Sequence, residues 1–97
     1  MSDASKTEEL YRKLKLQLEE TKTWPLEYLY KFIVKTDTSK IKKVEAFFND
    51  KGAVINTTKS KNGKYTSISI NVVMKNPDEV IKKYIEVTST IEGVISL

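Results

Sequence analysis

The sequence predicts a small α+β protein with one antiparallel β-sheet that two helices cover on one side. Three observations support this prediction. Apolar residues alternate with polar ones in several stretches, which is typical of half-buried strands. In the stretches between them apolar residues recur at helical spacing, which indicates amphipathic helices. The pair Asn62-Gly63 separates two of the alternating stretches, and this dipeptide is a strong β-hairpin signal.

Residues 5–22 form the first predicted element, an amphipathic helix. Ser5 followed by Glu8 has the pattern of a capping box, which marks a helix start. Leucines recur at four-residue spacing among charged side chains, at Leu10, Leu14 and Leu18.

The helix is expected to end before Trp24-Pro25, because proline disfavours helical backbone in the preceding residue. We therefore divide the chain into a helical extension, residues 1–23, and a domain, residues 24–97. We expect the extension to fold back over the uncovered face of the sheet, since this would hide its leucines from water.

The first predicted strand covers residues 27–36 and is rich in aromatic and β-branched side chains. Lys31 falls on its wetter face, whereas the opposite face carries Tyr28, Tyr30, Phe32 and Val34. Asp37 then begins a helix that we expect to end at Gly52, a residue suited to the left-handed position after a helix. The apolar stripe of this helix consists of Ile41, Val44, Phe47 and Phe48.

Residues 53–61 and 64–74 are the second and third predicted strands. A type I′ turn at Asn62-Gly63 would join them, and both central residues of such a turn have positive φ. The inward face of the third strand carries Ile68, Ile70, Val72 and Met74. Asn76-Pro77 is a typical helix start, and residues 94–97 form a short last strand after this helix.

Without the extension the predicted order is β-α-β-β-α-β, the order of ferredoxin-like sandwiches. Right-handed crossovers give the strand order 4-1-3-2 with both helices on one face of the sheet. The opposite face is left open. The two central strands would place polar side chains on it, at Lys31, Tyr65, Ser67, Ser69 and Asn71.

Composition limits the chemistry that the chain can perform. It has 97 residues, no cysteine and no histidine, which excludes disulfides, thiolate nucleophiles, histidine triads and the usual zinc sites. No apolar run approaches the roughly 18 residues of a membrane span, and the first residues do not resemble a secretory signal. We expect a cytoplasmic protein that is not an enzyme and needs no metal or cofactor.

Three motifs carry a resemblance to a known family: Trp24-Pro25, Tyr30-Lys31 and the hairpin from Ser60 to Ile70, with the sequence Ser-Lys-Asn-Gly-Lys-Tyr-Thr-Ser-Ile-Ser-Ile. Residues 24–97 resemble the YbeD-like family of small bacterial proteins of unknown function, whose hairpin has the pattern Ser-x-x-Gly-x-Tyr-x-Ser-x-Ser. The resemblance implies a ferredoxin-like fold close to ACT-type regulatory domains and implies no enzymatic activity.

We therefore expect a non-catalytic regulatory or interaction module. It would bind a protein partner or a small ligand through the open sheet face or at a homodimer interface. The expected contact residues are Trp24, Lys31, Ser60, Gly63, Tyr65, Ser67 and Ser69. Cross-strand pairing of Tyr and Ser side chains explains several of these residues equally well, and turn geometry alone explains Gly63.

Binding of single-stranded RNA is the alternative function. The net charge is +4, but the basic residues are sixteen lysines and one arginine, and lysine lacks the forked donors that read phosphate. Tyr65 is the one clear aromatic residue on the expected open face, whereas RNA-recognition sheets stack several bases. The sequence thus disfavours nucleic-acid binding as the function. It also disfavours a membrane, because the charges of the first helix are nearly balanced.

Overall fold

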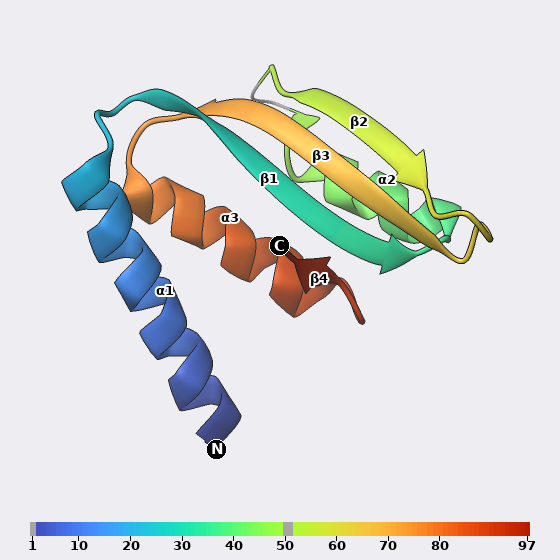
Figure 1. The fold of residues 1–97 in the computed structure, drawn as a ribbon, viewed down its shortest axis with the longest axis horizontal. Helices are drawn as coiled ribbons and strands as arrows, with labels where there is room; N and C mark the ends of the chain where they lie inside the picture. Colours follow the sequence, from blue (N-terminus) through green and yellow to red (C-terminus); the bar gives the residue numbers. More distant parts are fainter. Residues whose placement is uncertain (1, 50–51) are drawn as a thin grey trace.

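A computed structural model describes residues 2–49 and 52–97. The elements along the chain are shown in Figure 1 and are α1 Ser2–Thr21, β1 Leu26–Lys35, α2 Thr38–Ala46, β2 Val54–Lys59, β3 Tyr65–Met74, α3 Pro77–Thr90 and β4 Ile95–Ser96.

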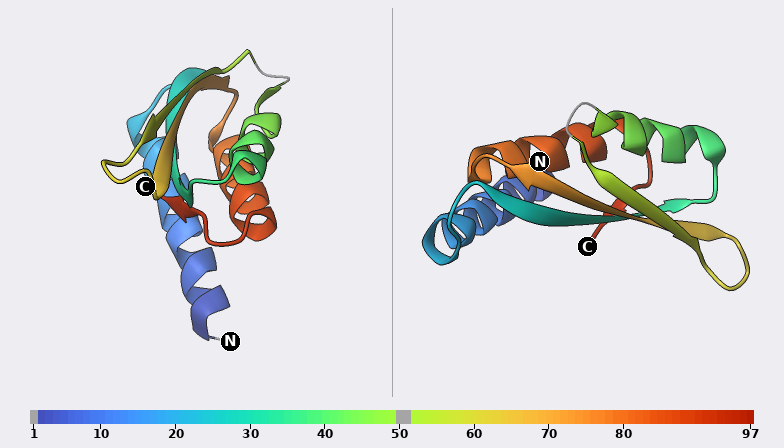
Figure 2. Two further views of the ribbon diagram at one scale, coloured as in Figure 1. Left: turned by 90° about the vertical axis from the view of Figure 1, so that its right-hand side faces the viewer. Right: turned by 90° about the horizontal axis from the view of Figure 1, so that it is seen from above.

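The strands form one antiparallel sheet with the order β2-β3-β1-β4. This is the predicted order read from the other edge, so the prediction of a four-stranded antiparallel sheet is confirmed. Strands β1 and β3 pair along their whole length, from Leu26 opposite Met74 to Lys35 opposite Tyr65. Helices α2 and α3 lie on one side of the sheet, as the left view of Figure 2 shows.

The core lies between the sheet and these two helices. Alternate residues of β1 and β3 are buried there, as the sequence predicts, because only one face of each strand meets the helices. Tyr30 is fully buried, with its ring centroid 4.8 Å from that of Tyr84 and 5.0 Å from that of Phe48. Its hydroxyl donates a hydrogen bond of 3.0 Å to the carbonyl of Val80 on α3.

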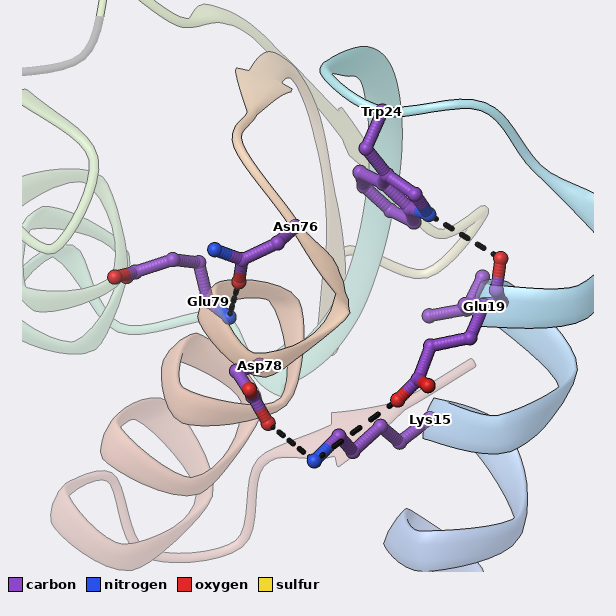
Figure 3. A network of polar contacts seen from close by, with 7 residues as sticks. Lys15, Glu19, Trp24, Asn76, Asp78 and Glu79 are labelled. Carbon is purple, nitrogen blue, oxygen red and sulfur yellow. Dashed lines mark hydrogen bonds and ion pairs between the residues drawn. The ribbon is translucent and has the colours of Figure 1, made fainter.

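Helix α1 lies beside α3 and does not cover the open side of the sheet (Figure 1). Leu18 is 7% exposed, and the ring of Tyr11 stacks on that of Tyr84 at 6.1 Å. An ion pair of 2.7 Å joins Lys15 to Asp78 on α3 (Figure 3). The expectation that α1 folds over the open face is therefore wrong. The aromatic flank of α3 offers apolar partners, whereas the centre of the open face carries Lys31, whose charge would lose water under a layer of leucines.

Two helix ends differ from their predicted positions. Helix α1 begins at Ser2, so Ser5 lies within the helix and is not the N-cap of a capping box. Helix α2 has the predicted N-cap, Asp37, but ends at Ala46. Gly52 has a φ of +67° but does not directly follow the helix. Part of the predicted helix end, residues 50 and 51, lies outside the described residues.

The hairpin between β2 and β3 has a longer loop than the predicted two-residue turn. Gly63 has a φ of +73°, but no described residue other than glycine has positive φ, so Asn62 does not occupy a type I′ position. The N–H of Gly63 donates to the carbonyl of Ser60 at 2.9 Å. The side-chain oxygen of Asn62 accepts a bond of 3.0 Å from the N–H of Lys64. Asn62 thus stabilises the loop through its side chain, and only the glycine supplies the left-handed residue.

Candidate functional site

The side of the sheet opposite α2 and α3 is uncovered and faces the viewer in Figure 1. We call it the open sheet face. The pairing register brings Lys31 opposite Ser69, Ile33 opposite Ser67 and Lys35 opposite Tyr65. The face consists of Glu27, Leu29, Lys31, Ile33, Lys35, Val54, Asn56, Thr58, Tyr65, Ser67, Ser69, Asn71, Val73 and Ile95.

One end of the open sheet face carries three exposed apolar side chains, with Glu27 opposite Val73 at its margin. Leu29 is 52% exposed, Val54 60% and Val73 62%. Leu29 and Val54 flank Asn71 from the two neighbouring strands, and Val73 follows Asn71 on the same face of β3. Exposed apolar side chains that gather in one place are a common feature of interaction sites.

The other end of the open sheet face is basic. A shallow hollow of about 370 Å³ is lined by Lys35, Lys64 and Tyr65. Lys31 lies on the same face of β1, four residues before Lys35 and separated from it by Ile33. In the described part of the chain only Lys15 and Lys83 take part in ion pairs, so the lysines of the hollow have no carboxylate within ion-pair distance there. This end of the face can therefore attract a negatively charged group.

Four predicted contact residues come together on the open sheet face: Lys31, Tyr65, Ser67 and Ser69. Tyr65 is 43% exposed and the two serines are half-buried. Their placement agrees with the sequence, because alternation fixes which residues share a face. Their role in binding stays a prediction.

Ser60 and Gly63 lie in the hairpin loop, beyond the strands. The hydroxyl of Ser60 accepts a bond of 3.1 Å from the N–H of Tyr65 and donates one of 3.0 Å to Asn62. Both bonds close the loop. The contacts of Ser60 and the backbone of Gly63 therefore have a structural explanation that needs no ligand.

Trp24 lies far from the hairpin, in the connection between α1 and β1. Its indole N–H donates a bond of 3.2 Å to the carbonyl of Leu18 in the last turn of α1 (Figure 3). The same carbonyl accepts the N–H of Lys22 at 3.2 Å, so the indole is a second donor at the end of the helix. The ring also packs against the core. Trp24 thus fixes the end of α1 and does not join the other predicted contact residues.

The apolar members of the face, Leu29, Val54 and Val73, were not among the predicted contact residues. Along β1 and β3, buried residues occupy every second position. An apolar residue at one of the intervening positions is the sequence signal for an exposed apolar side chain. Only the strand register shows that the three lie together. The same holds for Lys35, at the end of β1, and Lys64, in the hairpin loop before β3, which line one hollow.

The described residues show neither a metal site nor a membrane-spanning helix. Among the side chains that the structure describes, in residues 8–49 and 52–97, no three of the metal-ligating types gather closely enough to hold a metal ion. None of the helices described there has the length and apolar character needed to cross a membrane.

The fold and surface define a small α+β protein, whose described residues form a four-stranded antiparallel sheet, open on one side, and three helices. A family model described as "Protein of unknown function (DUF493)" matches residues 19–95, and the chain belongs to this family. The match supports the expectation that the chain belongs to a small family of unknown function. It does not confirm that this family is the YbeD-like family. No curated protein and no solved structure matched the chain.

Proposed function

We propose that the protein is a non-catalytic regulatory or interaction module whose open sheet face binds an acidic, partly apolar segment of a partner protein. The observation that carries this proposal is the arrangement of the face, in which exposed Leu29, Val54 and Val73 lie at one end and lysines at the other. The ferredoxin-like interpretation of the fold and the YbeD-like, ACT-like resemblance support the same class. The ACT-like resemblance also suggests another form of this function, in which the module binds a small ligand at a dimer interface.

The two ends of the face would contribute differently to binding. Burial of an exposed valine or leucine side chain stabilises a complex by about 1 to 2 kcal/mol, so the apolar end supplies affinity. Lys31, Lys35 and Lys64 would steer an acidic partner and set its orientation, because complementary charge acts mainly on association rate and specificity.

The proposal is tested with a double variant of the open sheet face, Leu29→Asp with Lys31→Glu. Both side chains are exposed, so the fold should persist, which circular dichroism can verify. The wild-type protein, used as bait in a cell extract, should enrich a partner that the double variant loses. The purified partner should bind the variant at least about tenfold more weakly.

Lys82→Glu is the matched control, because Lys82 is exposed on α3, on the far side of the sheet. It makes the same lysine-to-glutamate reversal as Lys31→Glu, so it controls for that charge change, and it should leave the partner bound. Equal enrichment of every captured protein by the double variant would show that the open sheet face is not the binding surface.

Single-stranded RNA is a second candidate, favoured by the hollow that Tyr65 lines together with Lys35 and Lys64. RNA binding to such a site would weaken steeply with salt and with Tyr65→Ala. A fluorescent single-stranded RNA titrated at low salt distinguishes the two candidates. We expect no saturable binding, and a salt-sensitive affinity that Tyr65→Ala lowers would replace our proposal with this one.

A further inference from the structure

A second apolar surface lies at the edge of the sheet, beside the first half of β1. It is a groove of about 510 Å³ between α1, α3 and the end of the chain. We call it the edge groove. Its apolar lining comes from Leu10, Tyr11, Leu14, Tyr28, Tyr84 and Leu97.

On the edge away from β3, the backbone of β1 next to the edge groove has no strand partner among the described residues. The last strand, β4, pairs only with Phe32 and Ile33, and the N–H of Leu97 donates to the carbonyl of Lys31 at 2.9 Å. In an antiparallel sheet the N–H and C=O of every second residue point to the same neighbour. The backbone groups of Leu29 and Glu27 therefore point to this same edge, beyond the end of β4.

The edge groove and the unpaired backbone groups of β1 lie side by side. The side chain of Tyr28 lines the groove, and Tyr28 lies between the two residues whose backbone groups face the edge. An extended peptide placed along β1 would bond to the backbone of Glu27 and Leu29. Every second side chain of that peptide would enter the groove, because side chains of a strand alternate between its two faces.

We propose that the edge groove binds an extended segment of another protein, which is added to the sheet as an antiparallel strand. The segment would follow the path that β4 begins at Ile95 and Ser96, so the new contacts continue an existing strand pairing. It would carry apolar side chains at alternate positions facing Tyr28 and Tyr84. Strand addition of this type combines backbone bonds for affinity with side-chain pockets for specificity.

A second copy of this chain fits the edge groove poorly. Such a copy could offer the same stretch of β1, whose Tyr28 already lines the groove of its own chain, or β2, the other edge of the sheet. One face of β2 carries Ile55, Thr57 and Lys59, and the other carries Val54, Asn56 and Thr58. Either face would place two polar side chains in an apolar groove, at a cost in free energy. A segment of a different protein, with apolar residues at every second position, is the better match.

The test begins with selection of short peptides from a random displayed library on the full-length protein. The selected sequences should share apolar residues at alternate positions. Leu10→Asp, which puts a charge on the wall of the groove, should weaken the selected peptide about tenfold or more. Leu16→Asp is the matched control on the same helix. Leu10 is 66% exposed and Leu16 52%, so both variants should fold, but Leu16 does not line the groove and its variant should bind as the wild type.

N-methylation of the selected peptide distinguishes strand addition from non-specific apolar binding. Methyl groups on alternate backbone nitrogens that face β1 should abolish binding. Methyl groups on the intervening nitrogens should leave it unchanged. Binding should also slow hydrogen exchange of the Leu29 amide. Lys35→Glu, on the open sheet face, should leave the peptide affinity unchanged, so this result is independent of the function proposed above.

Four results would overturn this inference. They are selection of no peptide, selected sequences with helical spacing of apolar residues, equal loss of binding with both methylation patterns, and equal effects of Leu10→Asp and Leu16→Asp. A dimer in sedimentation experiments that Leu10→Asp dissociates would assign the groove to a second copy of the chain and would likewise contradict it.

Discussion

The phenol groups of Tyr30 and Tyr84 lie inside the core, and each forms a hydrogen bond to a neighbouring element. The hydroxyl of Tyr30 donates to the carbonyl of Val80, and the hydroxyls of Tyr28 and Tyr84 are 2.9 Å apart. Burial raises the pKa of Tyr30 and of Tyr84 well above the ordinary value of 10.0, and the bond to Tyr28 raises the pKa of Tyr84 further. Each phenol is therefore neutral in the folded protein at a pH where the unfolded chain is already ionised.

This difference predicts that stability falls in alkaline solution. The folded pKa is the higher one, so the stabilisation is fully present below pH 10 and is lost as the pH rises above it. We expect the free energy of unfolding to decrease above about pH 10, by up to about 1.4 kcal/mol per pH unit for each of the two tyrosines. Urea unfolding at a series of pH values measures this decrease in the free energy of unfolding.

Tyr30→Phe is the control for this alkaline effect. It removes one titrating group and should make the decrease above pH 10 less steep, while the lost hydrogen bond costs about 1 kcal/mol at neutral pH. A slope equal to that of the wild type would mean that Tyr30 does not contribute to the pH dependence.

At the scale of elements, the β2–β3 hairpin depends on a single left-handed residue, Gly63. A Cβ atom at this position would have no other atom within 4 Å, so a substitution meets no clash. We predict that Gly63→Ala lowers the free energy of unfolding by about 1 to 2 kcal/mol through backbone strain alone. Lys61→Ala, in the same loop with an exposed side chain, should change it by less than about 0.5 kcal/mol. Equal urea midpoints for the two variants would be inconsistent with a left-handed residue in this loop.

The same hairpin shows what sequence alone could and could not predict. The Asn-Gly pair and the alternating apolar residues were sufficient to place both strands and their buried faces, because these signals are local. The turn type was mispredicted, since the bonds from Ser60 and Lys64 to Asn62 favour a longer loop. The early end of α2 was also missed, although its apolar residues Phe47 and Phe48 do pack against the core.

The candidate site was predictable in part for a related reason. Alternation placed Lys31, Tyr65, Ser67 and Ser69 on one face of the sheet, and the structure agrees. The apolar end of that face depends on which strands are neighbours, and the edge groove depends on where α1 docks. Both are tertiary features that the spacing of residues along the chain does not encode.

At the scale of the whole molecule, α1 packs into the same core as the sheet and α3. Leu18 is 7% exposed within that core, whereas Leu16 on the same helix is 52% exposed. We predict that Leu18→Ala lowers the free energy of unfolding by about 2 to 4 kcal/mol, because it leaves a cavity, and that Leu16→Ala changes it by less than about 1 kcal/mol.

Urea unfolding of these two variants tests whether α1 and the sheet form one cooperative unit. The transition is recorded by two probes, far-ultraviolet circular dichroism and the fluorescence of Trp24, the single tryptophan of the chain. Coincident transitions are expected, because Trp24 bonds to the last turn of α1 and packs on the core. Equal effects of the two substitutions, or a separate early loss of helical signal, would mean that α1 is detached in solution. The edge groove would then lack one of its walls, since Leu10 and Leu14 reach it from α1.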